Sequence, residues 1–157
     1  MALTVAEAEV LQSRPVQGRF QSHGAADTEA LGGRLAAELT AGDVVLVEGE
    51  LGAGKTTFVR GAARALGVTV PVTSPTFTIG HLYPADGRTS VAHVDLYRLA
   101  SLSGEDPDLL ADYVGADTIA FVEWPAAGES ELAQLGHVAA RVRLEHAGGD
   151  ERQVVMR

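Results

Sequence analysis

A glycine-rich segment at residues 49–56 constrains the fold of this chain more than any other feature. It reads Gly-Glu-Leu-Gly-Ala-Gly-Lys-Thr and matches G-x-x-x-x-G-K-[ST], the pattern of a phosphate-binding loop, or P-loop. Such a loop needs a buried strand before it and a helix after it, because its backbone N–H groups and the positive end of the helix dipole act together on phosphate oxygens. Both flanks are predicted here, since residues 44–47 form a short apolar run and residues 56–66 have helical periodicity. The sequence therefore favours a P-loop over a glycine-rich turn without function.

Lys55 is the only lysine among the 12 Lys and Arg residues of the protein. A position that keeps lysine in such a sequence favours a compact ammonium on a flexible stem over the planar guanidinium of arginine. We expect Lys55 to contact the β- and γ-phosphates of ATP and the Thr56 hydroxyl to bind Mg²⁺. The backbone N–H groups of Gly52, Ala53 and Gly54 would complete the phosphate site.

Composition and charge exclude several classes of function. The formal net charge of -9 argues against an extended nucleic-acid surface, so any role with RNA should be indirect. The absence of cysteine excludes disulfides, thiolate nucleophiles and cysteine-ligated zinc. The N-terminus has no basic leader before an apolar run, and no stretch approaches the roughly 18 apolar residues of a membrane-spanning helix. These features predict a cytoplasmic protein that does not insert into membranes.

Strand and helix signals alternate along the chain. We expect strands at residues 16–21, 44–47, 78–83, 90–95, 118–122, 138–145 and 153–156, the last two joined in a closing hairpin. We expect a first helix from an N-cap at Asp27 to a stop at Gly42, with Leu31, Leu35 and Leu39 on one face. A second helix should span residues 56–66 and stop at Gly67, and its inward residues should be Phe58, Ala62, Ala65 and Leu66. Residues 99–113 should be helical in parts, with Pro107 beginning a second short helix there, and residues 129–135 should form a last short helix.

This pattern predicts an α/β fold, a P-loop NTPase-like layered domain with a β-sheet flanked by helices. The sheet should be mixed, because Asp86-Gly87 is a strong hairpin signal inside an otherwise alternating order. Residues 1–15 have no clear period and are interpreted as an N-terminal extension. Residues 16–157 would then form a single P-loop ATPase domain.

Two carboxylates are candidates for the acidic partner of the metal. Asp95 and Glu123 each end an apolar strand, and ligands bind at the carboxyl edge of an α/β sheet. One of them could hold Mg²⁺ while the other orients the attacking water. Trp124 follows Glu123 directly, so it is expected to pack near the nucleotide site and to report on it.

The segment after the P-loop helix and the histidines carry weaker signals. Residues 73–78 are rich in hydroxyls and stiffened by Pro75, which suits either a γ-phosphate-sensing switch or a polar loop that leads into a strand. The five histidines have no metal-ligand spacing, so no zinc site is predicted. We expect His93 to orient a neighbour or to fill the core.

Four blocks of the sequence, at residues 49–58, 74–78, 93–99 and 122–125, together closely resemble the TsaE family. TsaE proteins are bacterial ATPases of tRNA threonylcarbamoyladenosine biosynthesis. The resemblance implies a small P-loop ATPase that acts with TsaD and TsaB, the partners that place threonylcarbamoyl on adenosine 37 of tRNA. ATP hydrolysis would support turnover of that assembly rather than perform the transfer.

The resemblance also implies roles for individual residues. Thr56 and Glu123 would ligate Mg²⁺, Asp95 would be the acid needed for hydrolysis, and Thr57 and Arg152 would contact the nucleotide. A switch-like loop would consist of Ser74, Pro75, Thr76, Phe77 and Thr78. Two departures from the family pattern are Glu50, where aspartate is usual, and the segment 22–25, which lacks the common acidic pair near the base pocket.

Catalysis would consist of positioning and charge stabilisation by Lys55, Mg²⁺ and backbone amides. No arginine is clearly placed as a finger, although Arg98 is a candidate, so we expect slow hydrolysis by the isolated protein and faster turnover with partners. One alternative is a small-molecule P-loop kinase, although residues 99–117, the only stretch available for a lid, contain no Lys or Arg. A second alternative is a nucleotide-gated binding module in which hydrolysis is incidental.

Overall fold

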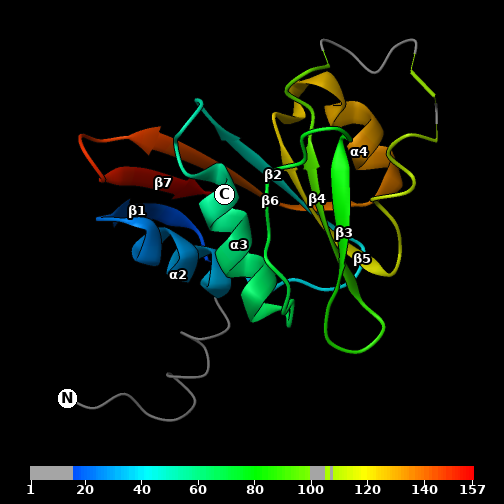
Figure 1. The fold of residues 1–157 in the computed structure, drawn as a ribbon, viewed down its shortest axis with the longest axis horizontal. Coiled ribbons are helices and arrows are strands. Elements are labelled where there is room, and N and C mark those ends of the chain that lie inside the picture. Colours follow the sequence, from blue (N-terminus) through cyan, green and yellow to red (C-terminus); the bar gives the residue numbers. More distant parts are fainter. Residues whose placement is uncertain (1–15, 100–104, 107) are drawn as a thin grey trace.

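The computed structural model describes residues 16–99, 105–106 and 108–157, and Figure 1 shows their arrangement. The described residues form one seven-stranded sheet in the order β1-β7-β6-β2-β5-β4-β3. The strands are β1 (Gly18–Ser22), β2 (Asp43–Gly49), β3 (Gly80–Pro84), β4 (Ser90–Asp95), β5 (Thr118–Glu123), β6 (His137–His146) and β7 (Arg152–Met156). The proposed N-terminal extension lies outside the described residues.

The sheet is mixed, as the sequence predicts. β2 lies between β5 and β6 and runs parallel to both, and β4 is parallel to β5. Both predicted hairpins are confirmed, because β3 pairs with β4 and β6 pairs with β7 in antiparallel fashion. β1 adds to β7 as an antiparallel edge strand. The central parallel strands therefore bring the carboxyl ends of β2, β4 and β5 to one edge of the sheet.

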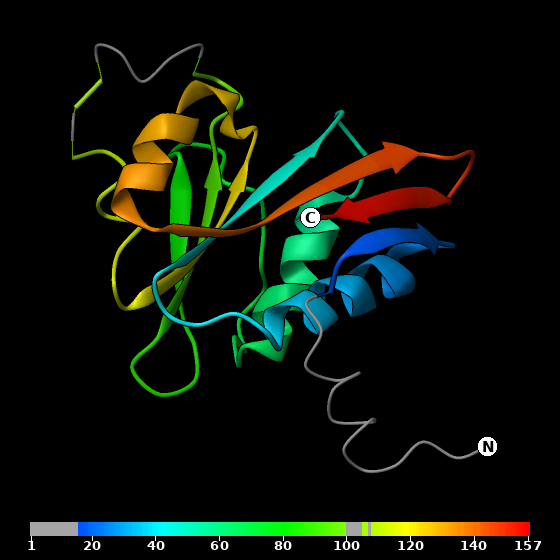
Figure 2. The same cartoon turned by 180° about the vertical axis from the view of Figure 1, so that it is seen from behind.

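Helices cover the two faces of the sheet (Figures 1 and 2). α2 (Ala25–Ala36) and α3 (Lys55–Ala65) pack on one face, where Leu35 and Phe58 join the larger core cluster. α4 (Glu129–Leu135) lies on the other face, where Leu132 joins a second core cluster. A short 3₁₀ turn, η1 (Pro125–Ala127), connects β5 to α4. The predicted layered α/β class is thus confirmed.

α2 and α3 approach so closely that side chains are excluded at two points. A Cβ atom on Gly32 would lie 2.2 Å from the Phe58 carbonyl oxygen, and one on Gly61 would lie 2.0 Å from that of Glu29. Glycine at both positions lets the two backbones touch. This contact fixes α2 against the helix that follows the P-loop.

Several predicted helix details are wrong. Asp27 is not the N-cap, because α2 begins at Ala25 after Gly24, and the Asp27 carboxylate instead accepts a hydrogen bond from the His23 backbone N–H at 2.9 Å. α2 also ends at Ala36, so Leu39 and Gly42 lie beyond it. The Leu39 N–H donates to the Ala36 carbonyl three residues back, and a second turn follows in which the Asp43 carboxylate accepts a hydrogen bond from the Thr40 N–H at 2.8 Å.

Other element boundaries shift by small amounts. β1 and β3 each begin two residues later than predicted, at Gly18 and Gly80. On α3, Ala65 is exposed and Leu66 only partly buried, while Val59 and Ala63 are buried. Gly67 ends this helix with φ 96°, as predicted, and α4 spans the predicted residues.

The predicted helices after residue 99 fall partly outside the described residues, which exclude 100–104 and Pro107. Residues 108–113, which the structure does describe, form turns rather than a helix. Within the described ranges, no helix is both long enough and apolar enough to cross a membrane.

Candidate nucleotide site

The P-loop connects the buried strand β2 to the N-terminus of α3. Gly54 adopts a left-handed conformation with φ 98° immediately before α3, and among the described residues no side chain caps this helix end. The backbone N–H groups of the first turn are therefore available to an anion, and the helix dipole favours negative charge at this position. The local geometry matches that of a P-loop.

Lys55 lies under the loop with only 6 % of its surface exposed. Its ammonium donates hydrogen bonds to the carbonyl oxygens of Gly49 and Glu50, each at 2.8 Å. It also lies 4.5 Å from the centre of the Trp124 ring, in cation–π contact. Burial lowers the pKa of Lys55, and the nearby charges of Glu123 and Asp95 oppose this shift.

Thr56 and Glu123 meet beside Lys55. The Thr56 hydroxyl lies 3.3 Å from one Glu123 carboxylate oxygen and 2.8 Å from the Ser74 hydroxyl. The other Glu123 oxygen lies 2.9 Å from Nε2 of His93, a fully buried side chain, and Glu123 itself is only 2 % exposed. His93 therefore orients a neighbour, one of its two predicted roles, and holds Glu123 with one oxygen directed toward Thr56.

Asp95 ends β4 directly opposite Glu123, because the two residues are paired in the parallel register of β4 and β5. Its carboxylate accepts a hydrogen bond from the Tyr97 N–H at 2.9 Å. Burial raises the pKa of Asp95, and the charge of Glu123 adds to this effect, while the Tyr97 hydrogen bond opposes it. The two predicted carboxylates thus lie side by side in different environments, one buried and bonded to His93 and one at the mouth of the site.

Most of the predicted site residues surround one cavity of about 290 Å³. The cavity is lined by Leu51, Gly52, Gly54, Lys55, Thr56, Thr57, Ser74, Asp95, Glu123 and Trp124. Ala53 does not line it, because Ala53 is fully buried behind the loop and its N–H donates to the Glu50 carbonyl. Trp124 closes one side of this cavity, as expected for a reporter of the site.

Arg152 borders the loop from its other side. Its guanidinium donates hydrogen bonds to the carbonyl oxygens of Gly52 at 3.3 Å and Gly149 at 2.8 Å. A second cavity of about 350 Å³ opens there, lined by Gly24, Ala25, Thr28, Gly52, Gly54, Thr57, Asp150 and Arg152. Sequence reasoning missed Thr28, on α2, and Asp150, in the turn between β6 and β7, because tertiary packing brings them to this cavity.

The predicted switch-like loop meets the nucleotide cavity at one residue only. Ser74 contacts Thr56, whereas Pro75, Phe77 and Thr78 line a neighbouring cavity together with Asp95 and Arg98. Arg98 donates a hydrogen bond to the Thr76 carbonyl, and Phe77 is fully exposed. The loop is therefore attached to the site at Ser74 and presents Phe77 to solvent.

The described residues contain no group of three or more His, Asp or Glu side chains that could hold a metal ion on their own. The oxygen donors that face the cavity are the Thr56 hydroxyl and the carboxylates of Glu123 and Asp95. Such hard oxygen donors suit Mg²⁺, which usually takes one or two protein carboxylates together with substrate phosphates and water.

A mixed sheet with a parallel centre, a P-loop between β2 and α3, and an acidic residue at the end of the adjacent strand β5 together define a P-loop NTPase-like α/β domain. Comparison with known proteins is consistent with this class. A family profile described as "Threonylcarbamoyl adenosine biosynthesis protein TsaE" matches residues 22–154. The chain therefore belongs to the TsaE family.

Individual relatives agree with the family profile. The chain is 46 % identical over 121 residues to the tRNA threonylcarbamoyladenosine biosynthesis protein TsaE of Streptomyces coelicolor, covering 76 % of this chain and 80 % of that protein. It is 40 % identical over 129 residues to the protein of the same name in Bacillus subtilis, covering 82 % and 77 %. The crystal structure of Bacillus subtilis YdiB superposes with a TM-score of 0.69 at 34 % identity, covering 89 % of this chain and 84 % of that one.

Proposed function

We propose that this protein binds ATP with Mg²⁺ at the cavity beside Lys55 and hydrolyses it. The observation that carries the proposal is the convergence of Lys55, Thr56, Asp95 and Glu123 on one cavity at the N-terminus of α3. These four residues supply a phosphate-binding cation, a metal-binding hydroxyl and two carboxylates, the parts that phosphoryl transfer needs.

The two carboxylates take different roles in this proposal. Glu123 holds Mg²⁺ together with Thr56, because His93 fixes its orientation and leaves one oxygen toward the Thr56 hydroxyl. Asp95 orients the attacking water, because it lies at the mouth of the cavity and its raised pKa makes it a better proton acceptor than an ordinary aspartate. Mg²⁺, when bound, neutralises charge on the phosphate oxygens.

Lys55 must leave its contacts to bind phosphate. Its ammonium donates to the Gly49 and Glu50 carbonyls, so ATP binding exchanges these hydrogen bonds for bonds to phosphate oxygens. Arg152 and Thr57 contact the nucleotide from the neighbouring cavity. The Ser74 contact with Thr56 gives the loop at 74–78 a way to respond to the occupied site.

In the cell, we infer that this ATPase supports threonylcarbamoyladenosine formation in tRNA, the process named for its relatives. It would act in the cytoplasm with TsaD and TsaB and would meet tRNA only indirectly, since its net charge of -9 does not suit a phosphate backbone. Hydrolysis should be slow alone and faster with these partners.

Phosphate release from ATP, measured with purified protein in Mg²⁺ and in EDTA, alone and with TsaD and TsaB, tests the proposal. We expect Mg²⁺-dependent release that increases with the partners and is lost in Lys55→Ala. Equal rates with and without the partners would contradict their role in turnover. Transfer of labelled phosphate to a small molecule would instead indicate a kinase.

The Asp95→Ala variant distinguishes an ATPase from a nucleotide-gated binding module. We expect this variant to bind ATP but to lose both hydrolysis and support of tRNA modification. If it keeps ATP binding and full modification activity, hydrolysis is dispensable and the gated module is correct.

A further inference from the structure

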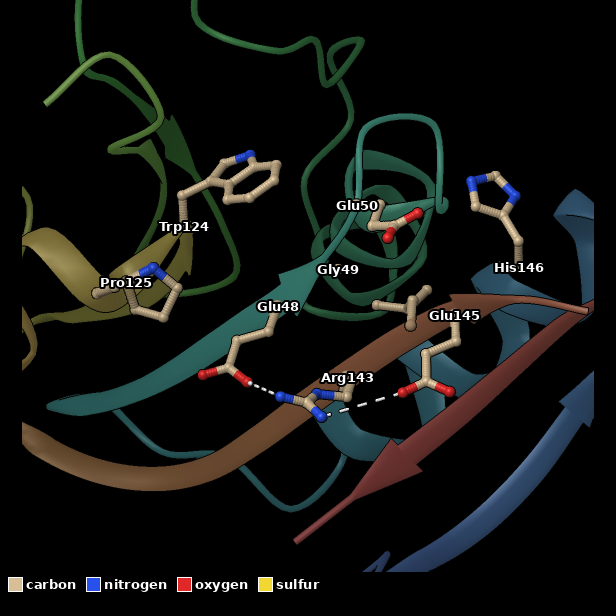
Figure 3. Close-up of a pocket in the computed structure, with 10 residues that line it drawn as sticks. Glu48, Gly49, Glu50, Trp124, Pro125, Arg143, Glu145 and His146 are labelled. Carbon is tan, nitrogen blue, oxygen red and sulfur yellow. Dashed lines mark ion pairs between the residues drawn. The ribbon is translucent and has the colours of Figure 1, made fainter. Parts of the chain in front are cut away.

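Another cavity, of about 620 Å³, also borders Trp124, and we call it the Trp124 groove. Figure 3 shows Trp124 and Pro125 along one side, Glu48, Arg143 and Glu145 along another, and Glu50 beside His146. Trp124 lines both this groove and the nucleotide cavity. The groove is open to solvent along β6, because the side chains of Arg143 and Glu145 are 60 % and 53 % exposed.

The charges in the groove leave an excess of carboxylate. Arg143 lies between Glu48, at 3.6 Å, and Glu145, at 4.0 Å, and Glu48 is also paired with Arg141, which in turn pairs with Glu129. Glu50 adds a third carboxylate and is exposed. The groove therefore combines net negative charge with the ring of Trp124, which also contacts the Lys55 ammonium and, at 5.0 Å between ring centres, Tyr97.

This combination suits a guanidinium group. Arginine stacks on aromatic rings and donates forked hydrogen bonds to carboxylates, and it is less strongly hydrated than lysine. An anion would meet Glu50 and Glu145 unfavourably, and a purely apolar group would leave Glu50, which has no ion pair among the described residues, without a charged partner.

Three residues that line the groove also contact Lys55. The carbonyls of Gly49 and Glu50 accept the Lys55 hydrogen bonds, and both residues line the groove. The Trp124 ring contacts the Lys55 ammonium. A cation that enters the groove and stacks on Trp124 would therefore act on the residues that keep Lys55 away from phosphate.

The protein's own arginines near the site are already engaged. Arg98 donates to the Thr76 carbonyl, and Arg152 donates to the carbonyls of Gly52 and Gly149. Neither of these two arginines lines the Trp124 groove.

We propose that the Trp124 groove receives an arginine side chain of a partner protein, held between Glu50 and Glu145 and stacked on Trp124. The identity of the occupant as a partner's residue rests on the proposed function, whereas the existence of a guanidinium site does not. The bound arginine competes with Lys55 for Trp124 and so promotes release of Lys55 toward phosphate.

Trp124 fluorescence provides a direct test, because Trp124 is the only tryptophan in the protein. The nucleotide-free protein is titrated with the blocked tripeptide acetyl-Gly-Arg-Gly-amide and with the matched Lys and Glu tripeptides. We expect a saturable change with the arginine peptide, a weaker one with lysine and none with glutamate. The double variant Glu50→Gln/Glu145→Gln should bind the arginine peptide roughly three- to tenfold more weakly, since each partly exposed charge pair contributes little alone.

The control variant Asp112→Asn/Asp117→Asn removes the same charge from two exposed residues before β5, at the opposite end of that strand from Trp124, and should bind like the wild type. Thermal unfolding of both variants confirms that they are folded. No saturable change, equal affinity in the two double variants, or a lysine or glutamate peptide that binds as tightly as arginine would overturn the proposal. ATP binding is measured on the same samples, so loss of the nucleotide function and loss of the groove are seen separately.

Discussion

The contact between His93 and Glu123 permits a sharp prediction, because it is the one polar contact that His93 makes with the described side chains. Nε2 lies 2.9 Å from the Glu123 carboxylate, whereas Nδ1 is buried without a hydrogen-bond partner among the described residues. His93→Leu replaces the ring with an apolar side chain of similar volume and removes both nitrogens. His93→Gln keeps an amide N–H near the position of Nε2.

The expected magnitude follows from these two nitrogens. Losing a hydrogen bond to a buried carboxylate costs about 1.5–3 kcal/mol, and removing an unsatisfied buried nitrogen recovers about 1 kcal/mol. His93→Leu should therefore lower the free energy of unfolding by about 0.5–2 kcal/mol. It should also weaken Mg²⁺ binding about tenfold or more, because Glu123 loses the group that orients it. His93→Gln should stay close to the wild type in both respects.

Urea unfolding gives the stability, and calorimetric titration of ATP at several Mg²⁺ concentrations gives the metal dependence. Affinity for ATP without Mg²⁺ should be unchanged, which a general loss of structure would not produce. His137→Leu serves as a control for the loss of an exposed histidine contact, since that side chain lies 3.0 Å from an Asp43 carboxylate oxygen, is 77 % exposed and lies at the opposite end of β6 from the P-loop. If His93→Leu keeps wild-type stability and Mg²⁺ dependence, or if His93→Gln fails as badly as leucine, the positioning role is wrong.

Three further predictions follow from the site and the fold. Lys55→Ala should lower ATP affinity about 30-fold or more, because a phosphate loses its cation, whereas the exposed Arg88→Ala should bind like the wild type in calorimetry. Because burial raises the pKa of Asp95, ionisation of this carboxyl group lowers the stability of the fold as pH rises through that pKa. Asp95→Asn should therefore slightly raise the free energy of unfolding at pH 7, and it should abolish hydrolysis because the carboxylate is gone. Urea unfolding across pH should show this gain disappearing below about pH 4, and a loss of stability at pH 7 would contradict the reasoning. Gly61→Ala should lower the free energy of unfolding by about 3 kcal/mol, because the new methyl group collides with the Glu29 carbonyl. Gly33→Ala is the control and should be tolerated, since its nearest contact is at 3.6 Å. Equal melting temperatures of the two variants would disprove the close approach of α2 and α3.

The sequence predicted the parts of the site that depend on local signals. The P-loop pattern and its flanks located Lys55 and Thr56, and apolar runs ending in acids located Asp95 and Glu123. Asp95 and Glu123 are paired at one edge of the sheet because β4 and β5 run parallel and in this register. The rule that ligands bind at the carboxyl ends of parallel strands had predicted this edge as the site.

Contacts that depend on register or on competing turns could not be read in the same way. The His93 bond to Glu123 joins residues 30 apart and requires the pairing of β4 with β5. The end of α2 was misplaced because leucine spacing continued to Leu39, while two turns follow Ala36, the second with the Asp43 carboxylate bonded to the Thr40 N–H. Local hydrogen bonding in these turns outweighed a periodic pattern there.

The burial of Lys55 under Trp124 has a chemical consequence. Amine-directed acylating reagents attack neutral amines, and the chain offers them one side-chain target, whose pKa burial lowers. That target reacts only when the loop releases it, so the labelling rate measures how often the P-loop opens. The protein thus carries a single lysine whose acylation reports on its own nucleotide cavity, and mass spectrometry of the peptide that contains Lys55 can follow it.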